Sequence, residues 1–267
     1  MNKIIYYYQT FVGLKPLLEQ EKIYTTHIIV SSIHFGRDKK EELYIHLNDY
    51  HPNDKRFIEV WKECEEASKK GITIMVMVGG AGGAYNTFFE SEETYKKCYL
   101  FLLELIEKFP FIKGIDLDVE ETVNLSNVTK LIRDIHNDFG DEFIITMAPV
   151  ANSLVYDYPG MGNFCYKDLI KKPEGKMIHW FNGQFYFQFT KECFESCVKN
   201  GYKPSSIVFG MISSDFINNF ENALQEIKKV KGKFNDFGGV YIWEYCNSPP
   251  NNKKPYLWSE EIGKICL

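Results

Sequence analysis

Eight short apolar segments alternate with charged, amphipathic segments along the chain, and this alternation most constrains the fold. The apolar segments are rich in Val, Ile, Leu, Met and Phe, as expected for parallel strands that are covered on both faces. We predict strands over residues 3–8, 27–35, 72–78, 112–120, 143–149, 178–187, 207–211 and 239–243.

The segments between these strands carry a helical period, in which apolar residues recur every three or four positions. We predict helices over residues 54–70, 91–109, 127–138 and 215–231, with shorter ones after residues 166 and 190. The two clearest apolar stripes consist of Phe57, Val60, Trp61 and Cys64, and of Tyr95, Cys98, Leu102, Leu105 and Ile106.

Strands that alternate with helices over about 250 residues are typical of a (β/α)8 barrel. No linker rich in Gly, Pro or Ser divides the chain. We therefore predict an α/β fold in which residues 1–267 form a single (β/α)8 TIM barrel domain. An open, doubly wound sheet is the structural alternative.

The composition is that of a folded protein with little charge bias. Of 267 residues, 45% are hydrophobic and 16% aromatic, so the chain can bury a large core and is not intrinsically disordered. A formal net charge of -5 argues against a general nucleic-acid binder. No apolar run reaches the about 18 residues of a membrane-spanning helix. We predict neither a nucleic-acid nor a membrane partner.

The N-terminal residues and the cysteines indicate the cellular compartment in which the protein is expected. Residues 1–9 lack the apolar stretch and the cleavage site of a signal peptide. Seven cysteines are an odd number without framework spacing, which favours free thiols and a reducing compartment. Cys193 and Cys197 have a spacing that suits a metal, but no His or second Cys pair accompanies them. We expect a cytoplasmic or intracellular monomer, with non-classical export as the alternative.

Residues 111–121, Phe-Ile-Lys-Gly-Ile-Asp-Leu-Asp-Val-Glu-Glu, place carboxyl groups at every second position of a predicted strand. Because a strand alternates faces, Asp116, Asp118 and Glu120 point one way and the aliphatic residues between them point the other. Three acids on the inner face of a barrel cannot all ionise easily, so one retains a proton and can act as a general acid. Alternating carboxylates also bind Mg²⁺ or Ca²⁺, and solvated or ion-paired acids are a further reading. The spacing alone leaves acid catalysis and metal binding open.

The motif Gly114-x-Asp116-x-Asp118-x-Glu120 resembles the fourth-strand signature of glycoside hydrolase family 18, the chitinases and endo-β-N-acetylglucosaminidases. The family pattern is DGxDxDxE, and Lys113 replaces its first Asp. Further segments similar to the family's motifs follow one another at the expected strands. They are Met77-Val78-Gly79-Gly80, with Met77 in place of Ser, Thr146-Met147-Ala148-Pro149, Gln184-Phe185-Tyr186 and Gly238-Gly239-Val240-Tyr241-Ile242-Trp243.

The resemblance implies a role for each matching catalytic position. Glu120 protonates the glycosidic oxygen, and the substrate's own 2-acetamido carbonyl attacks the anomeric carbon in place of an enzyme carboxylate. Asp118 orients the acetamido group and stabilises the charged intermediate, and Asp116 shares its proton or charge with Asp118. Tyr186 donates its hydroxyl to the acetamido oxygen. Neither a metal nor a cofactor is implied.

The same resemblance implies sugar contacts for Trp243, Gln184, Met147, Gly80 and Tyr6. Trp243 and Met147 also suit the core, and Gln184 also suits a hydrogen bond at the strand end. Two further tyrosines follow Tyr6, so the register of the first strand stays open.

One departure bears on substrate choice. Phe187 follows Tyr186, where many members of the family carry Asp or Asn near the reacting sugar. The acid machinery is unaffected, but we expect an altered sugar pocket.

We therefore predict a retaining endo-glycosidase that hydrolyses β-1,4 linkages after N-acetylglucosamine in chitin or chitooligosaccharides. The partner is an oligo- or polysaccharide that contains N-acetylglucosamine. Alternatives are an endo-β-N-acetylglucosaminidase acting on the chitobiose core of N-glycans, a catalytically silent sugar-binding barrel, and a metal-dependent hydrolase.

Overall fold

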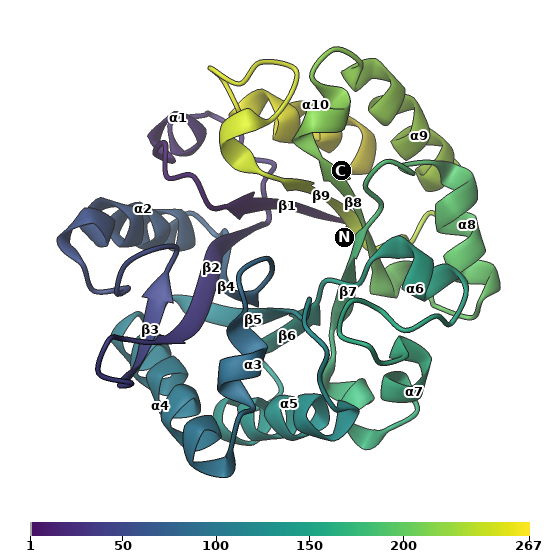
Figure 1. Cartoon of the computed structure of the whole chain (residues 1–267). Coiled ribbons are helices and arrows are strands. Elements are labelled where there is room, and N and C mark those ends of the chain that lie inside the picture. The colour runs from purple at the N-terminus through teal and green to yellow at the C-terminus, as the bar shows by residue number, and fades with distance from the viewer. Residues whose placement is uncertain (1) are drawn as a thin grey trace.

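The computed structural model describes residues 2–267, in which nine strands form one sheet around a central axis (Figure 1). The strand order is β1-β9-β8-β7-β6-β5-β4-β2-β3, and β1 also pairs with β2, which closes the barrel. All neighbours in the barrel are parallel, and only β3 runs antiparallel, on β2. The barrel strands are β1 (Lys3–Tyr8), β2 (His27–Arg37), β4 (Thr73–Gly79), β5 (Ile112–Asp118), β6 (Ile144–Met147), β7 (Trp180–Gln184), β8 (Ile207–Ile212) and β9 (Gly239–Trp243).

The helices lie outside the strands, and the two ends of the chain lie near each other (Figure 1). The backbone N–H of Lys3 on β1 donates to the carbonyl of Gly238, directly before β9, at 2.9 Å, which ties the first strand of the barrel to the last. The helices are α1 (Lys15–Leu18), α2 (Ile58–Lys69), α3 (Ala84–Phe88), α4 (Glu92–Lys108), α5 (Leu125–Phe139), α6 (Ala151–Val155), α7 (Tyr166–Ile170), α8 (Lys191–Lys199), α9 (Phe220–Lys233) and α10 (Tyr256–Cys266).

The barrel prediction is confirmed, and the open doubly wound sheet is wrong. One element was missed. Strand β3 (Leu43–Leu47) follows β2 through a tight turn and pairs with its C-terminal half. Its sequence alternates apolar and polar residues with only partial burial, as is typical of an edge strand outside the barrel.

Helix α4 shows why the helical pattern was readable. The hydroxyl of Ser91 accepts the backbone N–H of Thr94 at 3.0 Å, so Ser91 caps the helix, and Glu92 and Glu93 in the first turn suit the helix dipole. The predicted apolar stripe is buried against the barrel, as is the predicted stripe that leads into α2.

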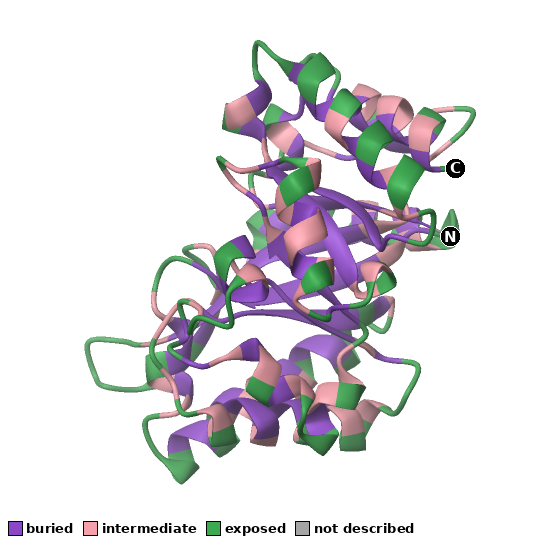
Figure 2. Ribbon diagram, turned by 90° about the vertical axis from the view of Figure 1, so that its right-hand side faces the viewer, coloured by how far each residue is buried: buried purple, intermediate pink, exposed green. Residues whose placement is uncertain are grey.

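Two apolar layers hold the barrel together (Figure 2). The larger layer lies between the strands and the helices, where the helices turn their buried faces inward and their exposed faces outward. The smaller layer fills the inside of the barrel. It consists of Ile5, Tyr7, Ile29, Met75, Met77, Trp180, Val208 and Tyr241.

Within the described residues, no helix has the length and apolar content needed to cross a membrane. The seven cysteines all carry free thiols. The intracellular location and the monomeric state stay predictions.

Candidate active site

The carboxyl groups of Asp116 and Asp118 on β5, and of Glu120 after it, face the inside of the barrel and its mouth. Asp116 is fully buried, Asp118 is 7% exposed, and Glu120 lies beyond the end of the strand at the mouth. Leu117 and Val119 pack instead into the layer beneath the helices. The predicted alternation of β5 is therefore confirmed, and the three acids form one column that rises toward the C-terminal mouth.

Asp116, at the base of this column, is held by three hydrogen-bond donors. Its carboxyl oxygens accept from the hydroxyl of Tyr7 at 2.7 Å, the hydroxyl of Thr146 at 2.6 Å and the amide of Asn182 at 3.0 Å. The indole N–H of Trp180 donates to the Asn182 carbonyl oxygen at 2.9 Å, which fixes the orientation of the amide. Burial raises the pKa of Asp116, although the three donors oppose that shift.

Asp118 and Glu120 lie above Asp116 and affect each other's protonation. Burial, followed by repulsion from Glu120 and Asp116, raises the pKa of Asp118 well above its ordinary value. Burial also raises the pKa of Glu120, against a hydrogen bond from Gln184. The amide of Gln184 donates to Asp118 Oδ1 at 3.2 Å and to the Ala148 carbonyl at 2.8 Å, which anchors it between β5 and β6. The pair therefore retains a proton at a pH where isolated carboxyl groups have lost theirs.

A glycine loop after β4 forms one wall beside the carboxyl column. The backbone N–H of Gly80 donates to the Asp118 carbonyl at 2.8 Å. Gly79 has a φ of +95°, and a Cβ there would meet the Asp118 carbonyl oxygen at 2.2 Å, so only glycine allows this approach. Glu121, which points away from the column as predicted, accepts the backbone N–H groups of Tyr85 and Asn86 at the start of α3.

A cavity of about 250 Å³ opens at the mouth above these acids. Its walls come from seven of the barrel strands and from the segments that follow them. Its lining residues are Gln9, Ser32, Met77, Gly80, Ala81, Asp118, Glu120, Gln184, Tyr186, Ile212 and Trp243.

Tyr186 and Trp243 lie on the wall opposite the glycine loop. The Tyr241 hydroxyl donates to the Tyr186 hydroxyl at 3.1 Å. Burial and the nearby acids raise the pKa of Tyr186, so its hydroxyl stays protonated and can act as a donor. The Trp243 ring lies 5.3 Å from the Tyr7 ring and lines the cavity. The predicted residues Glu120, Asp118, Gln184 and Gly80 lie around the same space, with Asp116 below it.

Two predicted sugar contacts are wrong. Tyr6 is fully buried in the layer between the strands and the helices, where its hydroxyl donates to the Pro255 carbonyl at 2.8 Å. It lies there because Tyr7 takes the inward position of β1. Met147 is also fully buried beneath the helices, since Thr146 takes the inward position of β6 and contacts Asp116. In both strands the alternation of faces decides the outcome.

Several site residues were missed by sequence reasoning. Thr146 and Asn182 are polar residues inside apolar strands, two positions before Ala148 and Gln184, so their register was a usable signal. Ser32 interrupts an apolar strand in the same way. No local signal marks Gln9, directly after β1, or Ile212, the last residue of β8, because they meet at the cavity only when the barrel closes.

Among residues 2–267, no three side chains of His, Cys, Asp or Glu gather in an arrangement that suits a metal ion. Both carboxyl oxygens of Asp116 and one of Asp118 instead accept hydrogen bonds from hydroxyl and amide donors. A parallel barrel with a pair of carboxyl groups in its C-terminal mouth is typical of barrel enzymes, whose active sites lie at that end of the strands.

The comparisons with known proteins give the family. The model of the glycosyl hydrolases family 18 matches residues 3–188. A fungal endo-β-N-acetylglucosaminidase of that family is 30% identical, with a TM-score of 0.90 and coverage of 99% of this chain and 98% of its own. The chitinase ChiC of Aspergillus fumigatus is also 30% identical, with a TM-score of 0.85 and coverage of 99% of each chain. The chain belongs to glycosyl hydrolase family 18 and is a glycoside hydrolase.

A family 18 chitinase from Pseudoalteromonas aurantia has the same fold at 17% identity, with a TM-score of 0.74 over 99% of this chain and 100% of its own. No curated protein sequence matches the chain. The resemblance found in the motifs is thus confirmed at the level of the family.

Proposed function

We propose that this enzyme hydrolyses the β-1,4 linkage between two N-acetylglucosamine units, with retention and with the substrate's acetamido group as nucleophile. One observation carries the proposal: the carboxyl groups that line the cavity, within residues 2–267, are those of Asp118 and Glu120, both at the end of β5. A retaining enzyme with its own nucleophile needs a second carboxyl group across the cleft, about 5–5.5 Å from the acid. This cavity offers Tyr186 and Trp243 on that side.

The first step breaks the glycosidic bond. Glu120 gives its proton to the leaving oxygen while the acetamido carbonyl oxygen bonds to the anomeric carbon, which forms a cyclic oxazolinium ion. Asp118 accepts a hydrogen bond from the acetamido N–H and compensates the positive charge. The Tyr186 hydroxyl donates to the acetamido carbonyl oxygen and holds it in line with the anomeric carbon.

The second step restores the enzyme. Ionised Glu120 takes a proton from water, and the water oxygen bonds to the anomeric carbon from the face that the leaving sugar vacated. The oxazolinium ring opens, the acetamido group re-forms, and the configuration is retained. Asp116, fixed by Tyr7, Thr146 and Asn182, stays beneath Asp118 and raises its pKa by repulsion.

The scissile disaccharide is the same in chitooligosaccharides and in the chitobiose core of N-glycans. We place chitooligosaccharides first, because every linkage in them is of this type and the ChiC chitinase is 30% identical over 99% of each chain. Cleavage of N-glycans is the second candidate, and the higher TM-score of the endo-β-N-acetylglucosaminidase favours it, 0.90 against 0.85.

The test is hydrolysis of a fluorogenic chitotrioside and of a high-mannose N-glycopeptide in parallel, each with Glu120→Gln as control. We expect release from the chitotrioside, and a loss of about 10²–10⁴-fold in kcat for the variant, because Gln cannot supply the proton. Cleavage of the glycopeptide alone would move the enzyme to the second candidate. Wild-type rates in Glu120→Gln would contradict the assignment of the acid.

A further inference from the structure

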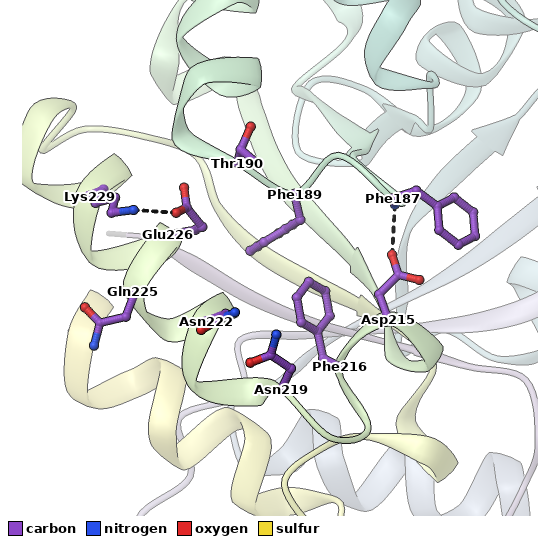
Figure 3. A pocket seen from close by; sticks show the side chains of 10 residues that line it. All are labelled: Phe187, Phe189, Thr190, Asp215, Phe216, Asn219, Asn222, Gln225, Glu226 and Lys229. Atoms are coloured by element: carbon purple, nitrogen blue, oxygen red, sulfur yellow. Dashed lines mark hydrogen bonds and ion pairs between the residues drawn. The ribbon is translucent and has the colours of Figure 1, made fainter.

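Carboxylates fasten the ends of neighbouring strands to each other around the mouth of the barrel. In each of these ties, a carboxylate that follows one strand accepts the backbone N–H of a residue that follows the strand beside it. Asp215, after β8, accepts from Phe187, after β7, at 2.8 Å, as the dashed line in Figure 3 shows. Glu121, after β5, likewise accepts from Tyr85, in the segment after β4.

Glu244 makes the same kind of tie at the seam where the last strand of the barrel meets the first. The paired residues of β1 and β9 end at Tyr6 and Ile242. Beyond them, the Glu244 carboxylate accepts the backbone N–H groups of Gln9 at 2.9 Å and of Thr10 at 2.7 Å, and the Thr10 hydroxyl at 2.7 Å. The side chain of Glu244 thus continues the closure of the barrel past the end of the ladder.

The carboxylate of Glu244 is more deeply buried than those of the other ties. Glu244 is 7% exposed, whereas Glu121 and Asp215 are half-buried. Its donors are the two backbone N–H groups, the hydroxyl and the Cys246 thiol at 3.4 Å, and none of these groups carries a charge. A buried carboxylate that loses its donors is costly, so this tie resists any displacement of the segment after β1.

Both ends of the tie carry residues that line the catalytic cavity. Gln9 lines the cavity directly after β1, and Trp243, the residue before Glu244, lines it at the end of β9. The Gln9 carbonyl also accepts the amide of Asn48 at 3.1 Å, which joins the same segment to the residue after β3. The position of this wall therefore depends on the hydrogen bonds of Glu244.

The charge of Glu244 does not act on the acid pair. Besides burial, the other acids of the column and Glu121 raise the pKa values of Asp118 and Glu120. Glu244 contributes to neither shift. Any effect of Glu244 on the reaction therefore passes through the position of the wall.

We propose that Glu244 is a positioning residue for glycoside hydrolysis: it fastens the segment after β1 to the end of β9 and so holds Gln9 and Trp243 in place around the reacting sugar. Glu244 does not itself line the cavity, so it acts through these two residues. The expected effect on turnover rests on the proposed function, whereas the tie itself does not.

The test uses one variant that removes the tie, one that keeps it and one control. Glu244→Ala removes it. Glu244→Gln keeps it, because one amide oxygen can accept both backbone N–H groups while the NH2 group donates to the Thr10 hydroxyl. Glu174→Ala is the matched control, since Glu174 is a 6% exposed carboxylate that accepts from Arg133 at 2.9 Å. Glu174 lies before β7, at the end of the barrel opposite the mouth.

Trp243 gives a readout that needs no substrate. Of the four tryptophans in the chain, Trp243 is half-buried and the others are at most 5% exposed. Acrylamide therefore quenches mainly the fluorescence of Trp243, and Trp243→Phe identifies its share of the emission. We expect stronger quenching in Glu244→Ala, and wild-type quenching in Glu244→Gln and Glu174→Ala.

Turnover of the fluorogenic chitotrioside gives the second readout. We expect kcat/KM to fall about 10- to 100-fold in Glu244→Ala, since a misplacement of about 1 Å can cost about 10²-fold. Glu244→Gln should stay near the wild-type rate with an unchanged pH–rate profile, and Glu174→Ala should lose stability but not turnover. Wild-type quenching and kcat/KM in Glu244→Ala, losses of equal size in Glu174→Ala, or a shifted pH–rate profile in Glu244→Gln would overturn the proposal.

Two further measurements keep the test decisive. If Glu244→Ala does not fold, Thr10→Val replaces it, because Val keeps the shape of Thr and removes only the hydroxyl donor. We then expect stronger quenching and a loss of about 3-fold in kcat/KM, the size of one hydrogen bond, and wild-type values of both would reject the tie. If the wild type does not hydrolyse the chitotrioside, the proposed function fails. Stronger quenching in Glu244→Ala with recovery in Glu244→Gln would still support the tie, and unchanged quenching would reject it.

Discussion

At the scale of single residues, the proposed mechanism depends on one proton that Asp118 and Glu120 share. Burial raises the pKa of both groups, and their mutual repulsion adds to the shift of Asp118. The amide of Gln184 donates to Asp118, and its hydrogen bond to Glu120 opposes the rise in the pKa of Glu120. Under the proposed mechanism, the raised pKa of Glu120 favours the protonated form that a general acid needs.

Asp118→Asn tests the coupling of the pair. We expect kcat to fall about 10²-fold, since the variant cannot compensate the charge of the oxazolinium ion. Removal of a like charge also lowers the pKa of Glu120, so the basic limb of the pH–rate profile should move to lower pH. Rates measured across pH with the chitotrioside check both effects. A profile that keeps both limbs in place would show that the two acids titrate independently.

Tyr186→Phe tests the donor on the opposite wall. The variant keeps the ring and loses the hydroxyl that aligns the acetamido oxygen, so kcat should fall about 10²-fold while KM changes little. Steady-state kinetics with the chitotrioside separates the two constants. A raised KM with an unchanged kcat would place this hydroxyl in ground-state binding. Tyr241→Phe is the matched control, because it removes only the partner hydroxyl of Tyr186.

At the scale of elements, the mouth depends on how the glycine loop is fixed to β5. Gly79 and Gly80 pack directly on the Asp118 backbone, and Glu121 holds the start of α3 from the same strand end. One short stretch of chain thus presents the acids on one side and anchors the wall of the cavity on the other. Helix α3 has only five residues, so the hydrogen bonds from its first N–H groups to Glu121 carry much of its local stability.

Glu121→Ala tests this anchor. Loss of the carboxylate leaves two backbone N–H groups of α3 without their acceptor, which should lower the free energy of unfolding by about 1 kcal/mol. Urea denaturation measures the change, and Glu121→Gln should recover part of it because one acceptor oxygen remains. Full stability in Glu121→Ala would mean that solvent replaces the cap.

At the scale of the whole molecule, the buried carboxyl groups of the column lower the free energy of unfolding at neutral pH. A carboxyl group with a raised pKa binds its proton more tightly in the folded state than in the unfolded state. The tighter binding of the proton stabilises the folded state fully at pH values below the pKa of the unfolded state. This stabilisation is lost as the pH rises through the pKa of the folded state. The barrel compensates this loss through the large apolar layer between strands and helices.

Asp118→Asn should therefore stabilise the folded chain at neutral pH, by about 1–2 kcal/mol, the usual gain when a destabilised functional group is replaced. The difference from wild type should shrink as the pH is lowered toward the unfolded pKa of Asp, where the wild-type carboxyl is protonated in both states. Thermal unfolding at several pH values gives the comparison. A difference that grows toward acid pH would reverse the sign of the assigned shift.

Much of the architecture could be predicted from the sequence because the patterns that indicate it are local. Continuous apolar strands and amphipathic helices follow one another in order, and the acids of β5 show their common face through a period of two residues. The alternation in β7 likewise set Gln184 and Tyr186 at the mouth of the barrel. Strand β3 was not predicted, because the hairpin that it forms with β2 interrupts the alternation of strand and helix.

By itself, the sequence determined the barrel, the family and the column of carboxyl groups, since each depends on patterns within one segment. The tertiary structure decided which tyrosine of β1 faces inward, which residue of β6 meets Asp116, and which loops reach the cavity. These outcomes depend on register and closure, because a strand's inward face is defined only when its neighbours are in place.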